Sequence, residues 1–246
     1  MQLTNRVVLI TGGKRIGATV AIQLARRGAD VALSYNRSES EALETAEAVR
    51  ALGRRAIVRQ ANLSDPEACA RLVAGVAGEL GGLDVLVHMA SIYEATPFAE
   101  LAVEDLQVCL DVEVKAGLAL SLGAASFMAP RGGGRIILFS DWLAVSDRPR
   151  YKGYLPYYVA KKAVMGLTEA LALELADDRT LVNAVAPGPI LAPPGVTEEE
   201  YEAVEKATPL GQWGGGEEIA KVVISLIETD FITGETIRVD GGRHVR

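Results

Sequence analysis

The sequence predicts an α/β protein whose single domain is built on a doubly wound parallel sheet of about seven strands, with helices on both faces. Three observations support this prediction. Short apolar runs alternate with stretches of helical periodicity along the whole chain. A glycine-rich turn joins the first run to the first helical stretch. The 246 residues lie near the upper limit of what one hydrophobic core organises, so we expect one domain over residues 1–246.

The elements follow one another in a regular order. An apolar run at 7–10 is typical of a strand buried on both faces. Apolar residues then recur at helical spacing over 16–25, and a second apolar run lies at 31–33, just after Gly28. Further strand-like runs lie at 56–58, 85–87, 136–139, 182–185 and 237–239, and the stretches between them include helical patterns at 38–52 and 66–80.

Composition and charge exclude several classes of protein. Hydrophobic residues make up 49% of the chain and charged residues 23%, which is typical of a globular protein and not of a disordered or fibrous one. The formal net charge of -7 repels a phosphate backbone, so we expect no nucleic-acid partner. Cys69 and Cys109 stand far apart, and the histidines are His88 and His244, so we expect reduced thiols and no metal site.

Nothing in the sequence predicts a membrane segment or an export signal. Residues 1–10 carry Arg6 inside a short apolar run, which indicates a first strand. The nearly apolar stretch 116–129 is too short to span a bilayer, so we expect a helix buried at an interface. We therefore expect a cytoplasmic protein without membrane contact.

The glycine-rich turn predicts a dinucleotide site of the Rossmann type. Glycines let the backbone approach a pyrophosphate, and the next helix presents free N–H groups to it. A plain connection between strand and helix is the alternative. Lys14 and Arg15 add cationic donors. The contacts expected from this turn are Gly12, Lys14, Arg15, Ile16 and Gly17.

The end of the second strand indicates which nicotinamide cofactor is used. An Asp or Glu there would bind the ribose 2′-hydroxyl of NADH and repel the 2′-phosphate of NADPH, but residues 34–38 contain neither. Arg37 and Arg15 together can hold a 2′-phosphate. Alternatively, Arg37 is solvated and Ser38 caps a helix, with Glu41 completing a capping box. We predict NADPH, with Tyr35, Asn36, Arg37 and Ser38 beside the adenosine ribose.

Two tyrosine–lysine pairs stand at helical spacing. Tyr157 and Lys161 lie four residues apart, as do Tyr158 and Lys162, so each pair shares one helix face. A lysine ammonium near a phenol stabilises the phenolate and lowers the pKa of the phenol, which makes the tyrosine a usable proton donor. A solvated helix face has the same spacing, so the spacing alone does not decide between them.

Four sequence motifs occur in a fixed order: the glycine turn, Tyr157-x-x-x-Lys161, the run from Asn183 to Gly188, and Val239-Asp240-Gly241-Gly242. Through them the chain resembles the short-chain dehydrogenase/reductase family over essentially its whole length. The resemblance implies that Tyr157 is the acid/base, and that Lys161 lowers its pKa and binds the nicotinamide ribose. It further implies a homotetramer paired through 102–128 and 157–175, and cofactor contacts by Asn62, Leu63, Met89, Ala90, Ser91, Pro187, Gly188 and Ile190. Separately, the long loop rich in Pro and Gly that begins at 187–195 predicts a lid at about 190–213.

Several positions depart from that family's pattern. Arg15 replaces a glycine of the turn, His88 begins a segment that replaces Asn-Asn-Ala-Gly, and Asp141 replaces the serine that polarises a substrate carbonyl. With Arg37-Ser38 and the run from Ala90 to Tyr93, these departures resemble the pteridine reductase branch, including bacterial dihydrofolate and dihydromonapterin reductases. The resemblance implies that Tyr93 stacks on a pterin ring opposite the nicotinamide and that Ser91 contacts both ligands. A core aromatic is the alternative for Tyr93.

The chemistry of Asp141 favours the same branch. A carboxylate beside a carbonyl would oppose the negative charge that develops on oxygen during hydride attack. A pterin instead offers amino and ring N–H groups to a carboxylate, and reduction of its C=N bond needs a proton that Tyr157 or a protonated Asp141 can relay. Glu113 stands where the family has an asparagine that holds a relay water. It either impairs catalysis or rebuilds the relay around a carboxylate.

Our main hypothesis is an NADPH-dependent reductase that transfers hydride to a C=N bond of a dihydropterin or dihydrofolate, with Asp141, Tyr157 and Lys161 as catalytic residues. The alternative is an NADPH-dependent carbonyl reductase, such as a 3-oxoacyl-(acyl-carrier-protein) reductase, in which Ser140 turns inward. A second alternative is an NADPH-binding sensor module without turnover. Between Asp141 and Tyr157, three basic residues either meet an anionic substrate tail or are solvated: Arg148, Arg150 and Lys152.

Overall fold

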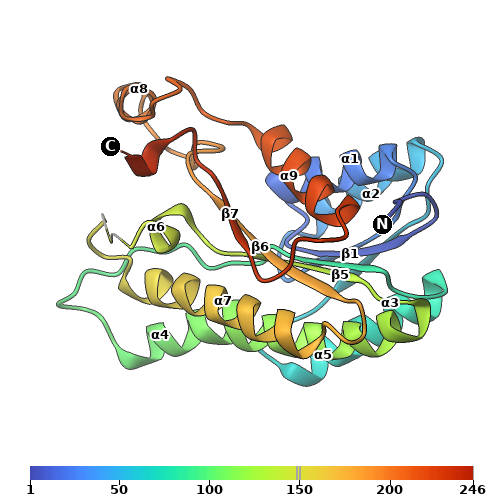
Figure 1. Ribbon diagram of the computed structural model, residues 1–246. Coiled ribbons are helices and arrows are strands. Elements are labelled where there is room, and N and C mark those ends of the chain that lie inside the picture. The colour runs from blue at the N-terminus through green and yellow to red at the C-terminus, as the bar shows by residue number, and fades with distance from the viewer. Residues whose placement is uncertain (148, 150, 246) are drawn as a thin grey trace.

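A computed structural model describes residues 1–147, 149 and 151–245, and these residues form one seven-stranded parallel sheet (Figure 1). Its strands are β1 (Val7–Thr11), β2 (Asp30–Tyr35), β3 (Ala56–Gln60), β4 (Val85–His88), β5 (Arg135–Phe139), β6 (Leu181–Pro187) and β7 (Thr236–Val239). They lie in the order β3-β2-β1-β4-β5-β6-β7, so the direction of winding reverses between β1 and β4. The predicted fold class and all seven predicted strands are confirmed.

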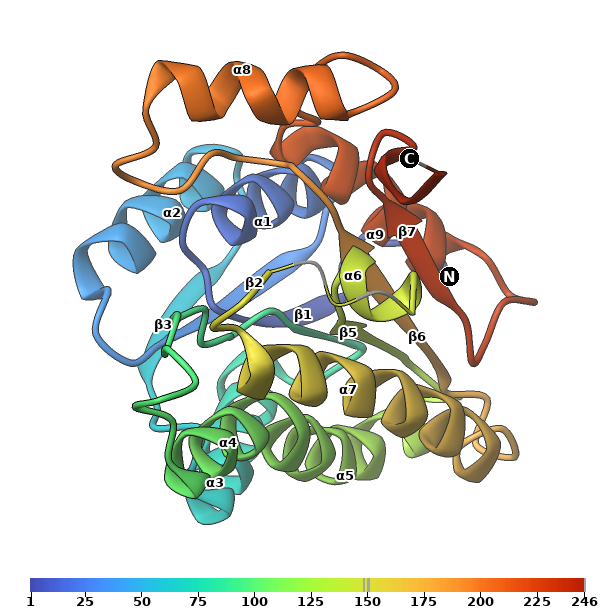
Figure 2. The ribbon, with the colours of Figure 1, turned by 90° about the vertical axis from the view of Figure 1, so that its left-hand side faces the viewer.

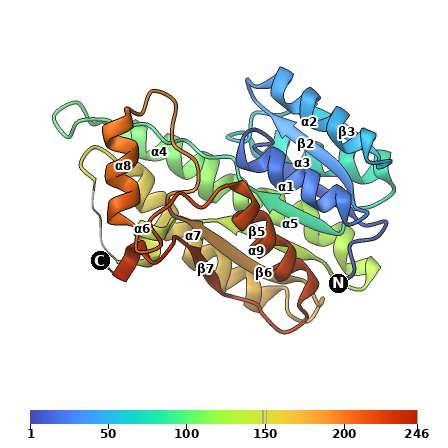
Figure 3. The ribbon, with the colours of Figure 1, turned by 90° about the horizontal axis from the view of Figure 1, so that it is seen from above.

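Helices cover both faces of the sheet. Above it in Figure 1 lie α1 (Ile16–Arg26), α2 (Glu39–Ala51) and α9 (Gly216–Glu228), and Figure 3 shows these three from above. Below it lie α3 (Pro66–Leu80), α4 (Val103–Leu110), α5 (Ala116–Met128) and α7 (Leu155–Glu174). A π-helical turn at Asp111–Lys115 joins α4 to α5. The short α6 (Trp142–Val145) and α8 (Glu198–Ala207) lie beyond the carboxyl ends of the strands.

Each face of the sheet has its own hydrophobic core, and β1 contributes to both. Val8 and Ile10 pack with the helices above the sheet, and Val7 and Leu9 pack with those below it. This alternation follows from the period of two along a strand. Each fully buried large aliphatic side chain stabilises the fold by about 1.5–3 kcal/mol. The central strands therefore form a rigid base, from whose carboxyl ends the functional loops extend.

Two local features differ from the sequence-based expectation. Ser38 precedes α2, but its hydroxyl makes no capping hydrogen bond, and Glu41 pairs with Lys14 at 3.1 Å. The predicted capping box is therefore wrong. Helix α8, inside the expected lid, was not predicted, although Thr197 and Glu200 do form a capping box there, with the Glu200 N–H donating to Thr197 Oγ1 at 3.3 Å.

The remaining expectations concern membrane, metal and thiol chemistry. Among the residues that the structure describes, no helix is both long enough and apolar enough to cross a membrane. Over the same residues, no group of three His, Cys, Asp or Glu side chains is placed to hold a metal ion. Cys69 and Cys109 are both free and buried.

Candidate active site

A cleft of about 1230 Å³ opens at the carboxyl ends of the central strands, where the strand order reverses and α/β sheets commonly bind ligands. Figure 2 looks onto this edge, with α8 passing above it and α7 below. All the residues predicted to contact cofactor or substrate lie on the wall of this cleft, and their roles remain predictions. They are Gly12, Lys14, Arg15, Ile16, Gly17, Tyr35, Asn36, Arg37, Ser38, Asn62, Leu63, Met89, Ala90, Ser91, Tyr93, Asp141, Tyr157, Lys161, Pro187, Gly188 and Ile190.

The glycine turn is packed too closely to accept side chains. A Cβ on Gly17 would lie 2.2 Å from the carbonyl oxygen of Gly12, and Gly12 itself has a φ of +78°. Across the cleft, a Cβ on Gly188 would lie 2.5 Å from the Cβ of Asp240. The backbone is thus bare on both sides of the cleft, as a bound dinucleotide requires.

The two basic residues of the turn contact other parts of the protein. Lys14 forms an ion pair with Glu41, as described above. Arg15 has a φ of 55° and donates hydrogen bonds to the carbonyl oxygens of Leu191 at 3.3 Å and Ala192 at 2.6 Å. Arg15 therefore links the glycine turn to the start of segment 190–213.

The expected adenosine end of the cleft is open and polar. The Asn36 and Arg37 side chains are exposed, and the Tyr35 hydroxyl donates to Glu39 at 2.7 Å. Asn62 accepts hydrogen bonds from the backbone N–H and the hydroxyl of Ser64, the latter at 2.7 Å. Arg37 is thus free of the lid contacts that hold Arg15, and it faces the same cleft.

Tyr157 and Asp141 form the centre of the site. The Tyr157 hydroxyl donates to Asp141 Oδ2 at 2.8 Å, and Asp141 Oδ1 accepts from the Leu143 N–H at 2.8 Å because Asp141 caps α6. Burial raises the pKa of Asp141, and these two hydrogen bonds oppose that rise only in part. Burial, followed by the charge of Asp141, raises the pKa of Tyr157 well above its ordinary value. The net direction is therefore upward, and the lowering of the Tyr157 pKa expected from Lys161 stays a prediction.

The Lys161 ammonium is held by other groups of the protein. It donates to Glu113 Oε2 at 2.7 Å and to the Phe139 carbonyl oxygen at 2.8 Å. Glu113 Oε1 also accepts from the Ser91 hydroxyl and, at 3.4 Å, from the Ile92 N–H. Glu113 thus lies against the lysine, at the position where the family resemblance puts an asparagine, and its charge offsets that of the ammonium.

Ser140 borders the cleft, but its hydroxyl is engaged inside the protein. It is 2% exposed, and its hydroxyl donates to the Lys161 carbonyl oxygen at 2.9 Å. Asp141, the next residue after β5, also lines the cleft. In this conformation, the serine invoked for the carbonyl reductase alternative helps to position α7.

An aromatic wall flanks Tyr157. The Tyr93 ring stacks on Tyr154, with centroids 4.6 Å apart and an interplanar angle of 22°, and it meets Tyr157 edge-on at 4.9 Å. Tyr93 is half exposed and lines the cleft, so it is not a core aromatic. Tyr154 was not among the site residues predicted from the sequence. Its position one helical turn before Tyr157 is the signal that places both rings on one side of α7.

Segment 190–213 is closed at its base and packed on itself. The N–H groups of Gly214 and Gly215 donate to the carbonyl oxygens of Pro189 and Ile190, each at 2.9 Å. Within the segment, Tyr201 stacks on Trp213 at 5.2 Å. From the 3-10 turn at Arg243–Val245, Arg243 donates to the Val204 carbonyl oxygen at 2.9 Å. This base and these contacts hold α8 over the cleft.

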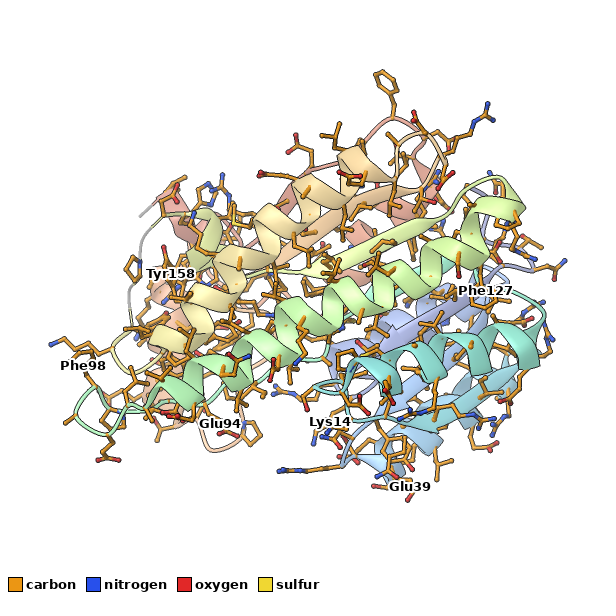
Figure 4. All side chains as sticks on the ribbon, turned by 90° about the horizontal axis from the view of Figure 1, so that it is seen from below. Lys14, Glu39, Glu94, Phe98, Phe127 and Tyr158 are labelled. Carbon is orange, nitrogen blue, oxygen red and sulfur yellow. The ribbon has the colours of Figure 1, made fainter. Side chains whose placement is uncertain are left out.

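Two predicted loop residues, Arg148 and Arg150, lie outside the described residues. Lys152, the third member of that basic loop, is exposed. The loop between β4 and α4 lies against this basic loop, because the Thr96 N–H donates to the Gly153 carbonyl oxygen at 2.9 Å. From it projects Phe98, which is 82% exposed (Figure 4).

The chain is similar to proteins of known class over nearly its whole length. Residues 12–244 match the family model described as Enoyl-(Acyl carrier protein) reductase. The 3-oxoacyl-(acyl-carrier-protein) reductase FabG of Staphylococcus aureus is 32% identical, with 100% of both chains covered. A short chain dehydrogenase from Burkholderia cenocepacia, solved in complex with NADP, has a TM-score of 0.91 at 34% identity and 99% coverage of both chains.

A blue fluorescent protein from a metagenomic library, solved in complex with NADPH, has a TM-score of 0.90 at 33% identity, again with 99% of both chains covered. None of the proteins named here is called a pteridine reductase, so the finer resemblance drawn from the sequence gains no support from them. The sequence match, the shared fold and the Tyr157/Lys161 pair at the cleft agree at the level of the family. The chain belongs to the short-chain dehydrogenase/reductase family of NAD(P)-dependent oxidoreductases.

Proposed function

We propose that this oxidoreductase uses NADPH to reduce a C=N bond in a flat, amino-bearing heterocycle of the dihydropterin or dihydrofolate type. The observation that carries this proposal is the 2.8 Å hydrogen bond from Tyr157 to Asp141 at the centre of the cleft. It places a carboxyl group beside the proton donor, where ketone reduction would call for a neutral hydroxyl.

The residues of the cleft fit NADPH. Gly12, Gly17 and Gly188 line the cleft without side chains, so a pyrophosphate and a nicotinamide can approach the backbone there. Arg37 is exposed at the adenosine end, and residues 34–38 include no acid that would repel a 2′-phosphate. The two solved structures above were determined in complex with NADPH and NADP. When bound, NADPH supplies the hydride.

The hydrogen bonds of Asp141 leave it free to bind a ligand. A carboxylate offers about four acceptor positions. In Asp141 the Leu143 N–H and the Tyr157 hydroxyl occupy one position on each oxygen. The remaining positions suit the amino and ring N–H groups of a pterin. Tyr157 Oη would then hand its proton to the ring nitrogen next to the reduced carbon, and Asp141 would orient both partners.

The shape of the pocket also suits a flat ring. Tyr154 covers one face of Tyr93, and Tyr157 meets that ring edge-on, so Tyr93 is held rigidly at the cleft wall. Aromatic rings prefer offset stacked or edge-to-face partners, at about 0.5–1.5 kcal/mol for each contact. A planar substrate stacked on Tyr93 would lie beside both Asp141 and Tyr157.

A second candidate is reduction of a 3-oxoacyl thioester. The name of the S. aureus relative favours it, and that relative is similar over its full length. The buried Ser140 and the carboxyl group of Asp141 oppose it, because they leave a substrate oxyanion facing a negative group. The two candidates share the fold, the cofactor and Tyr157, and differ at residue 141.

The deciding experiment follows NADPH absorbance with dihydrobiopterin, dihydrofolate, dihydromonapterin and an acetoacetyl thioester. We expect turnover of a pterin, and we expect Asp141→Ser to lose that turnover by about 100-fold or more. Asp177→Ser, at an exposed position, is the matched control. Turnover of the thioester alone would establish the second candidate. Tight NADPH binding without turnover of any of these compounds would favour the sensor module and contradict both.

Cofactor preference has a separate test. We expect Arg37→Ala to raise the KM for NADPH by about tenfold or more, because a charge-assisted hydrogen bond contributes about 1.5–3 kcal/mol. The KM for NADH, which lacks the 2′-phosphate, should change little and serves as the internal control. Equal effects on both cofactors would assign Arg37 to the solvated surface.

We also propose that the chain forms a homotetramer through α4, α5 and α7. Apolar side chains on the outer faces of these helices support it: Leu122 on α5 is 63% exposed, Val103 on α4 is 79% exposed and Leu173 on α7 is 79% exposed. Contiguous exposed apolar surface commonly marks an interface. Light scattering that gave the monomer mass would contradict this assembly.

A further inference from the structure

Lys161, the buried lysine of the site, uses most of its hydrogen-bond donors within the protein. Lys161 and Glu113 are 3% and 2% exposed, and their ion pair is joined by the bond from the ammonium to the Phe139 carbonyl oxygen. An ammonium has three N–H donors. Two of them point to these protein acceptors, so one remains for a ligand. Glu113 therefore sets both the position of Lys161 and the local balance of charge.

Glu113 reaches Lys161 because the helix widens at that point. Residues 111–115 form a π-helical turn inside an otherwise continuous helix from α4 to α5. Such turns are rare and commonly occur at functional sites. The turn leaves the Val112 carbonyl oxygen to accept from His88 Nε2 at 3.0 Å. This contact comes from β4 and anchors the turn to the sheet.

The bonding pattern fixes the tautomer of His88. A carbonyl oxygen can only accept, so Nε2 carries the hydrogen, and Nδ1 accepts from the Thr11 hydroxyl at 2.7 Å. Thr11 Oγ1 in turn accepts from the N–H groups of Met89 and Ala90. Burial lowers the pKa of His88, which agrees with a neutral ring. A neutral histidine thus holds the turn that carries Glu113.

The charged groups around Tyr157 are therefore two carboxyl groups and one ammonium. Asp141 contacts the phenol directly, and Glu113 offsets Lys161. In this family the positive charge of the lysine stabilises the tyrosine phenolate. A carboxylate beside the lysine therefore makes ionisation of Tyr157 less favourable. The titratable groups that face this cluster are Asp141 before α6, Tyr154 just before α7, Lys161 on α7, Tyr93 in the loop after β4, His88 on β4, and Cys109 on α4.

We propose that Glu113 is a positioning residue that cancels the charge of Lys161, keeps Tyr157 protonated, and so biases the enzyme toward reduction. In reduction, hydride adds to the substrate carbon, the π electrons move to the heteroatom, and the heteroatom takes the proton as the Tyr157 O–H bond breaks. In oxidation the same tyrosine must begin as a phenolate and accept that proton. A site that disfavours the phenolate therefore favours the first direction. This inference rests on the family reaction and holds for either candidate substrate.

The first test measures the ionisation of Tyr157 and needs no substrate. Tyrosinate absorbance is titrated in the full-length protein and in Tyr157→Phe, and their difference isolates this residue. The same difference is taken between Glu113→Gln and the double variant Glu113→Gln/Tyr157→Phe. We expect the midpoint of Tyr157 ionisation in Glu113→Gln to lie at least about one pH unit below that in the parent protein. At a given pH below both midpoints, this is a tenfold change in the ionised fraction. An unchanged or higher ionisation range would overturn the proposal.

In Glu113→Gln, the new amide can still accept a hydrogen bond from Lys161 and donate one to Ser91. The variant therefore keeps these contacts and removes only the charge. Glu113→Asn, with the residue that the family resemblance places here, is the second variant in case the first fails to fold. Glu104→Gln removes a charge from an exposed position of α4 and is the control.

The second test compares directions on whichever substrate is turned over. The ratio of kcat in oxidation to kcat in reduction, each measured at saturating substrate and cofactor, should rise about tenfold in Glu113→Gln and stay constant in Glu104→Gln. An equal loss in both directions would mean that Glu113 serves only the fold. Because the titration uses no substrate, failure of the substrate proposal cannot be mistaken for failure of this one.

Discussion

The Arg15 guanidinium donates a 2.6 Å hydrogen bond to the Ala192 carbonyl oxygen, and so joins the glycine turn to the segment that covers the cleft. The two residues are 177 positions apart in the chain. A cofactor phosphate at the turn would lie beside the same guanidinium, which has five N–H donors in a fixed plane. Arg15 is thus placed to sense both the cofactor and the position of segment 190–213.

Replacement of Arg15 by alanine should loosen that segment. Two hydrogen bonds to Leu191 and Ala192 would be lost, at about 1 kcal/mol each, so cleavage within α8 by a glutamate-specific protease should accelerate about 30-fold. Arg26→Ala, an exposed arginine at the end of α1, is the matched control. Equal cleavage of the two variants would show that the contact does not restrain the segment.

Tyr157→Phe should lower kcat by about 100- to 10,000-fold, because it removes the general acid without changing the ring. NADPH affinity, measured by binding, should change little. Tyr158→Phe is a strict control, since Tyr158 is the next residue of α7 and points away from the Asp141 contact that Tyr157 makes. Comparable activity losses in the two variants would assign the effect to helix packing and not to proton transfer.

The sheet and most of the cleft follow from local patterns in the sequence. Continuous apolar runs predict strands buried on both faces, and helical periodicity predicts the connections, so topology rules bring the loop after β1 and the residues after β4, β5 and β6 to one edge. Asp141 and Tyr157 could be placed in one site on this basis. Their direct hydrogen bond depends on how α6 and α7 pack, which no local pattern specifies.

The features that escaped prediction depend on contacts between distant residues. The π-helical turn at 111–115 is held by His88 from β4, and the periodicity of the sequence there gives no sign of it. The Ser38–Glu41 capping box had the right spacing, but Lys14 from the neighbouring turn pairs with Glu41. In both cases a tertiary partner decides between local alternatives that the sequence leaves nearly equal.

Gly17→Ala tests whether the glycine turn has room for a single additional methyl group. Its Cβ would lie 2.2 Å from the Gly12 carbonyl oxygen, so the turn must move, and we expect a loss of about 2–3 kcal/mol in the free energy of unfolding. Gly78→Ala is the counterpart, because a Cβ there meets nothing within 4 Å and lies on the exposed side of α3. That variant should gain about 0.5–1 kcal/mol. Urea denaturation measures both, and equal changes in the two would refute the steric argument.

Asp84 links the stability of the fold to pH. Its buried carboxylate accepts from Arg6 at 2.8 Å, from Arg131 at 2.9 and 3.1 Å, and from the Val7 N–H at 2.9 Å. Burial alone would raise the pKa of Asp84, but the bonds from Arg131, Val7 and Arg6 outweigh it and lower that pKa. A lowered folded-state pKa means that the carboxylate stabilises the fold above the unfolded-state pKa and ceases to do so as the pH falls through the folded-state value.

Asp84→Asn should therefore be less stable than the parent protein by about 2–3 kcal/mol at pH 7, and the difference should shrink as the pH falls below about 4. This loss of stability is at the low end for a broken buried ion pair, because Arg6 and Arg131 are about one third exposed and water can solvate them in the variant. Unfolding by urea across this pH range measures it, with the exposed Asp178→Asn as control. A difference that stayed constant with pH would mean that Asp84 acts through its shape and neutral hydrogen bonds, and not through its charge.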